Sequence, residues 1–463
     1  MTTPVASRIN LLFCISFVAL SLAYTGQAKA EPSVQDKSDR STPAKAWENN
    51  LTLWGITLYG TVDIGVAHLD HGAPLSATYG PGLPFLLQKF NNKPITSFAP
   101  NGLSQSKIGI SGVEPVGGGV SAVFKLETGF QPTSGQLTDG QKSLVLSNGV
   151  PLAQQRESGD SSRAGQAFQG AAYAGLQSKT WGALTYGRQN SLILDDLQKY
   201  DPQLQSQAFS PVGYSGVAGG GGDTEDARLD QTLKYALQFH QVRVTVLHQF
   251  ERRGGLPGGA DQVNVGGDIG GLSADATYSH IADAVSAAPL TAAQAAVAPG
   301  TLAGTISDNT AWTLQGKYAW KKLRVFAGYE HIELVNPARP VAKGADAAGG
   351  YDLSTVSNTA YTNHKVQQFS WLGLRYALSP KLDLTVAGYR NVQNSYKGNG
   401  CSDRSASSCS GAHTEASLVA DYRLTKHFDV YAGLNSSAAA GGMASGFLNT
   451  AVLSEMGGIR FSF

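Results

Sequence analysis

The chain has 463 residues, of which 42% are hydrophobic and only 15% are charged, and its formal net charge is +1. This near-neutral balance provides no basic field for nucleic-acid binding. After residue 30 no stretch reaches the roughly 18–20 unbroken apolar residues of a membrane helix. Any membrane-spanning part must therefore be a closed β-barrel, because lipid leaves no other way to satisfy the backbone hydrogen bonds.

The N-terminal segment, residues 1–30, resembles a secretory signal peptide. Arg8 precedes a short apolar core, and the segment ends in the small-x-small cleavage pattern AKA. The following residues 31–50 are polar and charged, which predicts a disordered extension. Residues 51–463 are expected to form the folded domain.

Short segments that alternate apolar and polar residues begin at residue 56 and continue to the end of the chain. In ITLYGTVDIGVAHL (56–69), Leu58 and Val62 fall on one face of a strand, and Thr61 and Asp63 fall on the other. The same alternation recurs in segments 322–334, 381–390 and 413–424. This period of two predicts β-strands with one apolar and one polar face.

The connections between these segments alternate in length. The short ones are 114–119, 178–181, 239–241, 270–271, 320–322, 379–381 and 425–427. The long ones lie near 70–105, 131–165, 191–227, 252–259, 284–308, 335–365, 396–412 and 436–449. Tight turns at one rim and long loops at the other are typical of a membrane barrel. The pattern predicts an all-β fold, a transmembrane 16-stranded antiparallel up-and-down β-barrel.

Aromatic residues near the strand ends support a membrane position. They are Tyr59, Tyr173, Tyr235, Tyr318, Trp320, Trp371, Tyr376 and Tyr431. Such residues form girdles at the two membrane interfaces of a barrel. We therefore expect this set to face the lipid boundary.

Two of the three cysteines, Cys401 and Cys409, lie in one Gly/Ser-rich connection, and the third, Cys14, lies in the leader. An exported chain meets an oxidising compartment, so a disulfide between Cys401 and Cys409 is expected. Two free thiols in a loop are the alternative. No metal site and no cofactor are expected.

Three early segments of the chain carry a family resemblance. ITLYGTVDIGVAHL (56–69), SKIGISGVEPVGGGVSAVFKLETGF (106–130) and AFQGAAYAGLQSKTWGALTYGRQ (167–189) are similar to successive hairpins of the Gram-negative porin family. They are most similar to the trimeric general-diffusion porins of beta-proteobacteria. The C-terminal GIRFSF, ending in Phe463, resembles the signal that such barrels present to the barrel-assembly machinery.

The resemblance implies a homotrimer of barrels, each with its own water-filled pore for small hydrophilic solutes and ions. It also implies that the third long loop folds inward and narrows the pore. The acidic residues expected at this constriction are Asp195, Asp196 and Asp201. The basic residues expected on the facing pore wall are Lys107, Lys125, Arg188, Arg228, Lys234 and Arg243. A short helix is expected near residues 192–199.

The expected location is the outer membrane of a Gram-negative bacterium, where the barrel would contact lipid and lipopolysaccharide. A solute-specific channel or receptor of the same fold is one alternative. A secreted β-rich adhesin or an outer-membrane hydrolase is another. The hydrolase reading has little support, because Ser104-x-x-Lys107 fits a serine–lysine spacing that recurs by chance. The chain is expected not to be an enzyme and not to bind nucleic acid.

Overall fold

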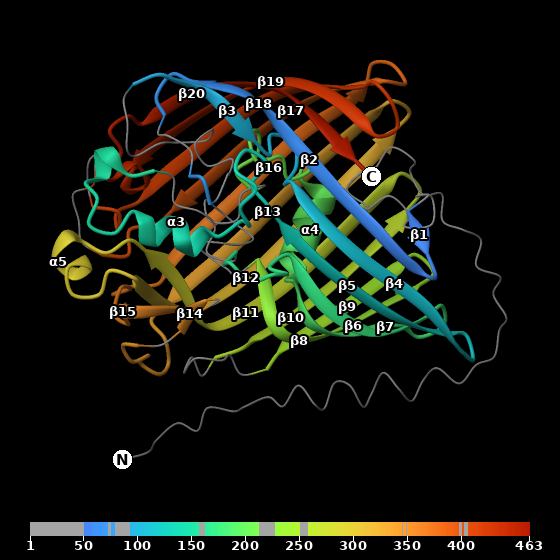
Figure 1. Cartoon of the computed structure of the whole chain (residues 1–463), viewed down its shortest axis with the longest axis horizontal. Coiled ribbons are helices and arrows are strands. Elements are labelled where there is room, and N and C mark those ends of the chain that lie inside the picture. Colours follow the sequence, from blue (N-terminus) through green and yellow to red (C-terminus); the bar gives the residue numbers. More distant parts are fainter. Residues whose placement is uncertain are drawn as a thin grey trace, which may run out of the picture. The chain divides into compact units, whose positions relative to one another are not determined.

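A computed structural model of the chain is shown in Figure 1. It describes residues 51–72, 76–78, 93–156, 163–212, 227–250, 258–344, 346–348, 350–397, 401 and 406–463. The expected signal peptide at 1–30 and the polar extension at 31–50 lie outside the described residues.

The described residues are mostly β-structure. The strands that build the wall are β2 (Ile56–Leu69), β4 (Lys107–Gly117), β5 (Val120–Gly129), β6 (Ala171–Ser178), β7 (Gly182–Asn190), β8 (Arg228–Phe239), β9 (Val242–Gln249), β10 (Ala260–Ile269), β11 (Leu272–Ala288), β12 (Leu302–Trp320), β13 (Leu323–Val335), β16 (Lys365–Ala377), β17 (Leu382–Gln393), β18 (Gly411–Arg423), β19 (Phe428–Gly441) and β20 (Ala451–Ser462). Shorter strands are β1 (Thr52–Leu53), β3 (Ile95–Pro100), β14 (Asp346–Ala348) and β15 (Tyr351–Ser357). The helices are α3 (Gly140–Leu146), η2 (Leu152–Gln154), α4 (Leu192–Tyr200), α5 (Ala292–Ala295) and η3 (Gly442–Ala444).

Each wall strand pairs antiparallel with its neighbour in sequence, and the last strand pairs with the first. β2 pairs with β4 on one side and with β20 on the other, where Thr61 lies opposite Ser462. Within the described part of the chain this gives a closed antiparallel barrel of 16 strands (Figure 1). The predicted fold class is confirmed.

The connections confirm the predicted alternation of tight turns and long loops. All seven tight turns lie between consecutive wall strands where the short connections were predicted, for example β8–β9 and β10–β11. Several strands extend further toward the long loops than predicted: β11 ends at Ala288 and β19 at Gly441. The sequence did not reveal these extensions because lipid no longer meets every second side chain beyond the membrane, so the alternation of apolar and polar residues fades there.

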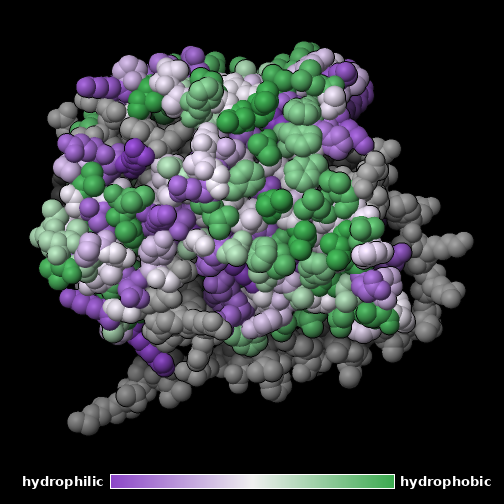
Figure 2. All heavy atoms as spheres, in the orientation of Figure 1, coloured by the Kyte–Doolittle hydropathy of each residue, from purple (hydrophilic) through white to green (hydrophobic). Residues whose placement is uncertain are grey.

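The outer face of the barrel is apolar. Leu314, Leu372 and Trp320 point outward and are 59%, 60% and 57% exposed. Figure 2 shows apolar side chains gathered over the strands on the visible face and polar ones over the loop end. None of the helices among the described residues is long and apolar enough to span a membrane.

The aromatic expectation holds for only part of the set. Tyr318, Trp320 and Tyr376 are exposed on the outer face, whereas Trp371 and Tyr431 are 4% and 2% exposed. The last two, together with Tyr59 and Tyr173, lie in inward-facing rows of their strands. A position near a strand end does not determine which face a side chain occupies. Successive residues point to opposite faces, so a shift of one residue moves the side chain from the lipid to the lumen.

Three of the long loops pack on one another at the loop end. Leu144 of α3, Val285 and Leu302 belong to one apolar cluster with Leu353 of β15. β15 also pairs in parallel with the outer end of β12. The loop after β5 is therefore held against the loops on the far side of β11.

Candidate pore constriction

The loop between β7 and β8, called loop 3 here, spans residues 191–227 and begins with α4. Ser191 caps this helix, because its side chain accepts a hydrogen bond from the Leu194 amide at 3.2 Å. Asp195 in the first turn and Lys199 in the last turn each complement the helix dipole. Pro202 lies two residues beyond the helix, where the chain turns away.

The apolar face of α4 packs against the inner wall. Ile193 and Leu197 are fully buried in a cluster with Ile332, Phe369 and Trp371. Burying a side chain of this size contributes about 1.5–3 kcal/mol. The described part of loop 3, residues 191–212, therefore lies inside the barrel, as expected from the family resemblance.

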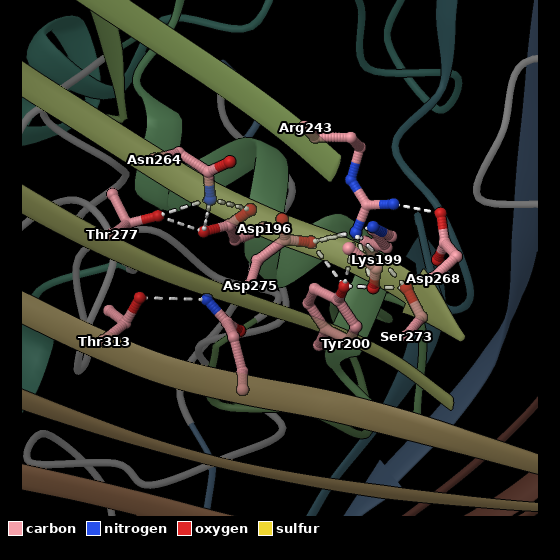
Figure 3. Close-up of polar contacts among 12 residues, drawn as sticks. Asp196, Lys199, Tyr200, Arg243, Asn264, Asp268, Ser273, Asp275, Thr277 and Thr313 are labelled. Carbon is pink, nitrogen blue, oxygen red and sulfur yellow. Dashed lines mark hydrogen bonds and ion pairs between the residues drawn. The ribbon is translucent and has the colours of Figure 1, made fainter. Parts of the chain in front are cut away.

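Polar contacts hold the other side of α4 to β10 and β11 (Figure 3). Asp196 accepts hydrogen bonds from Asn264 Nδ2, at 3.2 and 3.1 Å, and from the Thr277 hydroxyl. Lys199 Nζ lies 2.8 Å from the Asp275 carboxylate, to which the Tyr200 hydroxyl also donates.

Beyond the helix the chain continues along the wall over β16, β17 and β18. Trp371 Nε1 donates to the Tyr200 carbonyl at 3.0 Å, and Arg375 donates to the Pro202 carbonyl at 2.8 Å. Asp201 is fully buried and accepts a hydrogen bond from the Tyr389 hydroxyl at 2.6 Å. This part of loop 3 is thus fixed by side chains of the wall.

Two of the three acidic residues expected at the constriction therefore face the wall and not the lumen. Asp196 and Asp201 are 6% and 0% exposed, since their carboxylates fill the contact between loop and wall. Asp195 differs, because its side chain is 41% exposed. It forms an ion pair with Lys234 of β8 and accepts a hydrogen bond from Asn190 Nδ2 at 2.9 Å.

Burial shifts the ionisation of the loop residues. It raises the pKa of Asp196 to about 7, and the nearby Asp275 carboxylate adds to the shift. Burial also raises the pKa of Asp201. The pKa of Lys199 is lowered by burial, against the opposing effect of Asp275.

The wall strands β4 and β5 carry a second charged group on their inner face. Lys107 and Lys125 lie 3.1 and 3.3 Å from the carboxylate of Glu127, and the Tyr59 hydroxyl donates to it at 3.0 Å. The two lysine side chains are 37% and 29% exposed, whereas Glu127 is 8% exposed. The accessible surface of this group is therefore basic.

The other expected wall bases occupy different environments. Arg243 lies on the inner face and contacts Asp275 at 2.9 Å and Asp268, so it belongs to the contact beneath α4. Arg228 opens β8 and interacts electrostatically with Glu127. Lys107, Lys125 and Lys234 lie in inward rows, and their ammonium groups pair with Glu127 or Asp195.

Arg188 differs from the expectation. The residues on either side of it, Gly187 and Gln189, belong to the inward row, as shown by the hydrogen bond from Thr185 to Gln189 at 2.8 Å. Arg188 therefore falls in the outward row and pairs with Asp230 at 2.7 Å. An irregularity in the β7–β8 pairing accommodates this pair.

Several residues of the site were not identified from the sequence: Asn264, Asp275, Thr277, Trp371, Arg375 and Tyr389. The alternation along each strand indicates that these side chains face inward. It does not indicate which of them contact loop 3. No group of three or more His, Cys, Asp or Glu side chains in the described ranges is arranged to hold a metal ion.

Two further predicted features, a disulfide and the C-terminal segment, lie away from loop 3. Cys401 and Cys409 are joined by a disulfide in the loop after β17. The Phe463 amide and carbonyl each form a 3.0 Å hydrogen bond with Gly60 on β2, so the last residue lies at the seam that closes the barrel.

The arrangement is that of a closed membrane β-barrel whose interior is narrowed by a loop anchored to its own wall. A family model for the Gram-negative porins matches residues 17–439. The chain belongs to this family, and it is a protein of the outer membrane.

Individual relatives agree with the assignment. The chain is 30% identical over 148 residues to an outer membrane porin protein of Bordetella pertussis, an alignment that covers 32% of this chain and 31% of that protein. It therefore spans about a third of the length of the curated relative that it matches.

Solved structures share the fold. An anion-selective porin from Comamonas acidovorans has a TM-score of 0.56 at 15% identity, covering 88% of this chain and 99% of that chain. The trimer form of OmpT, an outer membrane protein of Vibrio cholerae, has a TM-score of 0.54 at 14% identity, covering 88% and 99%.

Proposed function

We propose that this porin forms a water-filled channel for passive diffusion of small hydrophilic solutes, with a weak preference for anions. The observation that carries the proposal is the charge balance at the space left open by loop 3. There Lys107, Lys125 and Lys234 face two acids, Glu127 and Asp195. Within these two groups of described residues, three lysines against two acids leave one positive charge in excess, and the lysines are the more exposed members of the first group.

The physical basis is electrostatic. A lumen charge in water-like surroundings attracts a counter-ion at about 8 Å by roughly 0.5 kcal/mol, which corresponds to about a two-fold preference. A preference of this size selects ions without binding them, so solutes leave as readily as they enter. The similarity to an anion-selective porin supports the sign of the preference.

The assembly state and the partners belong to the same proposal. The trimer form of a structural relative supports a homotrimer. We also propose contacts with lipid and lipopolysaccharide around the apolar outer face. The barrel-assembly machinery would recognise the terminal segment that ends in Phe463.

We propose further that the chain has no catalytic activity. In the one serine–lysine spacing, Ser104 and Lys107, the base is engaged elsewhere, because Lys107 Nζ pairs with the Glu127 carboxylate at 3.1 Å. A nucleophile needs a base within hydrogen-bonding reach.

Planar-bilayer recording of the purified oligomer across a salt gradient tests the channel. We expect current that rises linearly with voltage and a reversal potential of the sign for anion preference. A saturable flux that one solute class blocks would favour the solute-specific alternative. The absence of any conductance from correctly assembled, heat-modifiable protein would contradict the proposal.

A further inference from the structure

The second strand of the barrel is interrupted. Both β3 and β4 pair with β2, and Pro100 lies opposite Ile64, whereas Lys107 lies opposite Thr61. Only two residues of β2 thus face the six residues 101–106, which must leave the sheet. Asn101 has a positive φ of 63°, and its side chain accepts a hydrogen bond from the Ser106 amide at 2.7 Å, which closes this excursion.

The carboxylate of Asp63 organises the excursion from the wall. It accepts hydrogen bonds from the amides of Gly102 at 3.2 Å, Leu103 at 2.9 Å and Ser104 at 2.9 Å. The hydroxyl of Tyr431, on β19, donates to it at 2.6 Å. Asp63 is 0% exposed, and a buried carboxylate is tolerated only when hydrogen-bond donors surround it in this way.

The excursion in turn holds residues 206–209 of loop 3. This segment is called the far end of the loop here, because the described part of the loop stops at residue 212. The Gly102 carbonyl accepts hydrogen bonds from the Ser206 hydroxyl at 2.6 Å and from the Ala208 amide at 3.1 Å. Ala208 and the next residue, Phe209, are both 1% exposed and belong to an apolar cluster with Leu103 and Tyr431. The contact therefore combines direct hydrogen bonds with packing.

The geometry leaves little freedom at this contact. A Cβ on Gly102 would lie 2.2 Å from the Tyr431 hydroxyl, so the peptide can approach Asp63 and Tyr431 only because residue 102 is glycine. The anchors under α4 lie on β10 and β11 and hold the near end of the loop. The far end depends on residues of β2, β19 and the excursion.

We infer that Asp63 is a positioning residue of the pore: through the excursion at 101–106 it sets where the far end of loop 3 lies across the lumen. This inference rests on the proposed channel function for its effect on conductance. Its structural part, the contact of Ala208 with Gly102, is measurable without any current.

The test uses a reporter thiol at a position the contact buries. The full chain with Cys14→Ser and Ala208→Cys is assembled in the outer membrane, where the disulfide occupies Cys401 and Cys409. Maleimide labelling at position 208 is then compared with and without Asp63→Asn or Asp63→Ala. We expect labelling to accelerate by about tenfold or more, most for alanine, because the change leaves several buried donors without a charged acceptor.

A matched control is Asp383→Asn. Asp383 is also a carboxylate of the inner wall, and it pairs with Arg423 at 2.7 Å. This change is expected to leave labelling at position 208 unaltered.

The Asp63 variants should also add sub-conductance states to single-channel records while the heat-modifiable mobility of the oligomer stays unchanged.

Unchanged labelling in an assembled Asp63→Asn protein would overturn the inference. If Asp63→Ala does not assemble, Asp63→Asn and Ser206→Ala decide, since Ser206→Ala removes one hydrogen bond of the same contact from the loop side. An absence of conductance in the unaltered chain would count against the proposed function. The labelling result would still test the contact between Ala208 and Gly102.

Discussion

The acidic residues of loop 3 divide into two kinds according to their exposure. The Asp195 side chain is 41% exposed and pairs with Lys234, whereas Asp196 and Asp201 are buried against the wall. A buried carboxylate that accepts several hydrogen bonds contributes to the position of the loop and little to the field in the lumen. An acidic loop sequence therefore does not by itself imply a cation-selective pore.

The lumen bases predict a change in ion preference. Replacing both Lys107 and Lys125 by glutamine should shift the reversal potential toward cation preference, by about two-fold in permeability ratio for each charge removed. The shift should be largest in dilute salt, since the screening length is about 30 Å at 0.01 M and about 3 Å at 1 M. Bilayer recording at both salt concentrations measures it.

A lysine in a tight turn provides the control for this experiment. Lys381→Gln removes the same charge outside the lumen, between β16 and β17. It should leave the reversal potential unchanged. An equal shift in the turn variant would mean that net charge, and not the lumen group, determines the preference.

Asp196 predicts a pH dependence of loop docking. Its pKa is 3.8 when exposed and is raised to about 7 when the helix is docked. Between these values the docked loop holds a proton on Asp196 that an undocked loop has released. The contribution of Asp196 to docking therefore weakens as the pH rises from 3.8 to about 7 and is constant above. Hydrogen exchange of the α4 amides, corrected for intrinsic rates, should show protection that declines over this range.

Asp196→Asn should remove the Asp196 contribution and so reduce this dependence, because an amide can occupy the site beside Asn264 and Thr277 without titrating. The amides of α3, in the loop after β5, serve as an internal control. Protection of α4 that is independent of pH in the unaltered chain would contradict the prediction.

At the scale of elements, glycines let loop 3 lie directly on the wall. A Cβ at Gly373 would be 2.3 Å from the Pro202 ring, and one at Gly433 would be 2.6 Å from the Phe209 ring. These two contacts lie on β16 and β19, so the loop follows a path of small residues across several strands. The barrel wall is thus shaped to receive this one loop.

The loop after β17 is a separate element with its own constraint. Cys401 and Cys409 are eight residues apart, and Gln393 Nε2 donates to the Cys409 carbonyl at 2.6 Å. We expect alkylation of both thiols only after reduction, with trimer mobility and conductance nearly unchanged. The reason is that a bond closing a short loop constrains little of the unfolded chain. Immediate labelling of the native protein, or loss of conductance on reduction, would refute this.

For the whole molecule, closure of the barrel depends on the contact between its first and last strands. The ring of Phe463 occupies the space beside Gly60, where an added Cβ would lie 2.5 Å from Cζ. We expect Gly60→Val to prevent closure, because overpacking costs about 1–3 kcal/mol. We expect Phe463→Ala to lower the yield of heat-modifiable barrel severalfold, because it removes the partly buried ring from the seam.

Mobility of unboiled outer-membrane fractions on a denaturing gel measures both effects. Gly388→Ala is the control, since the nearest atom to a Cβ there is a backbone oxygen at 4.0 Å. Normal assembly of Gly60→Val would show that the seam tolerates a different packing.

The local pattern of the sequence was sufficient for the strands and their connections. Alternation of apolar and polar residues identifies a strand from its own residues, and a membrane forces that alternation because lipid meets every second side chain. The helix near residues 192–199 was also predictable. The strand break at 101–106 was not, because it depends on Asp63 of a neighbouring strand.

The sequence by itself determined the fold class, the number of wall strands and the inward position of residues such as Lys107 and Lys125. Only the tertiary structure decided which charges remain in the lumen. Asp196 and Lys199 are three positions apart in one helix, yet their partners lie on β10 and β11. Burial of these side chains depends on where the loop contacts the wall. The two-residue alternation along a strand does not indicate contacts between residues so far apart in the chain.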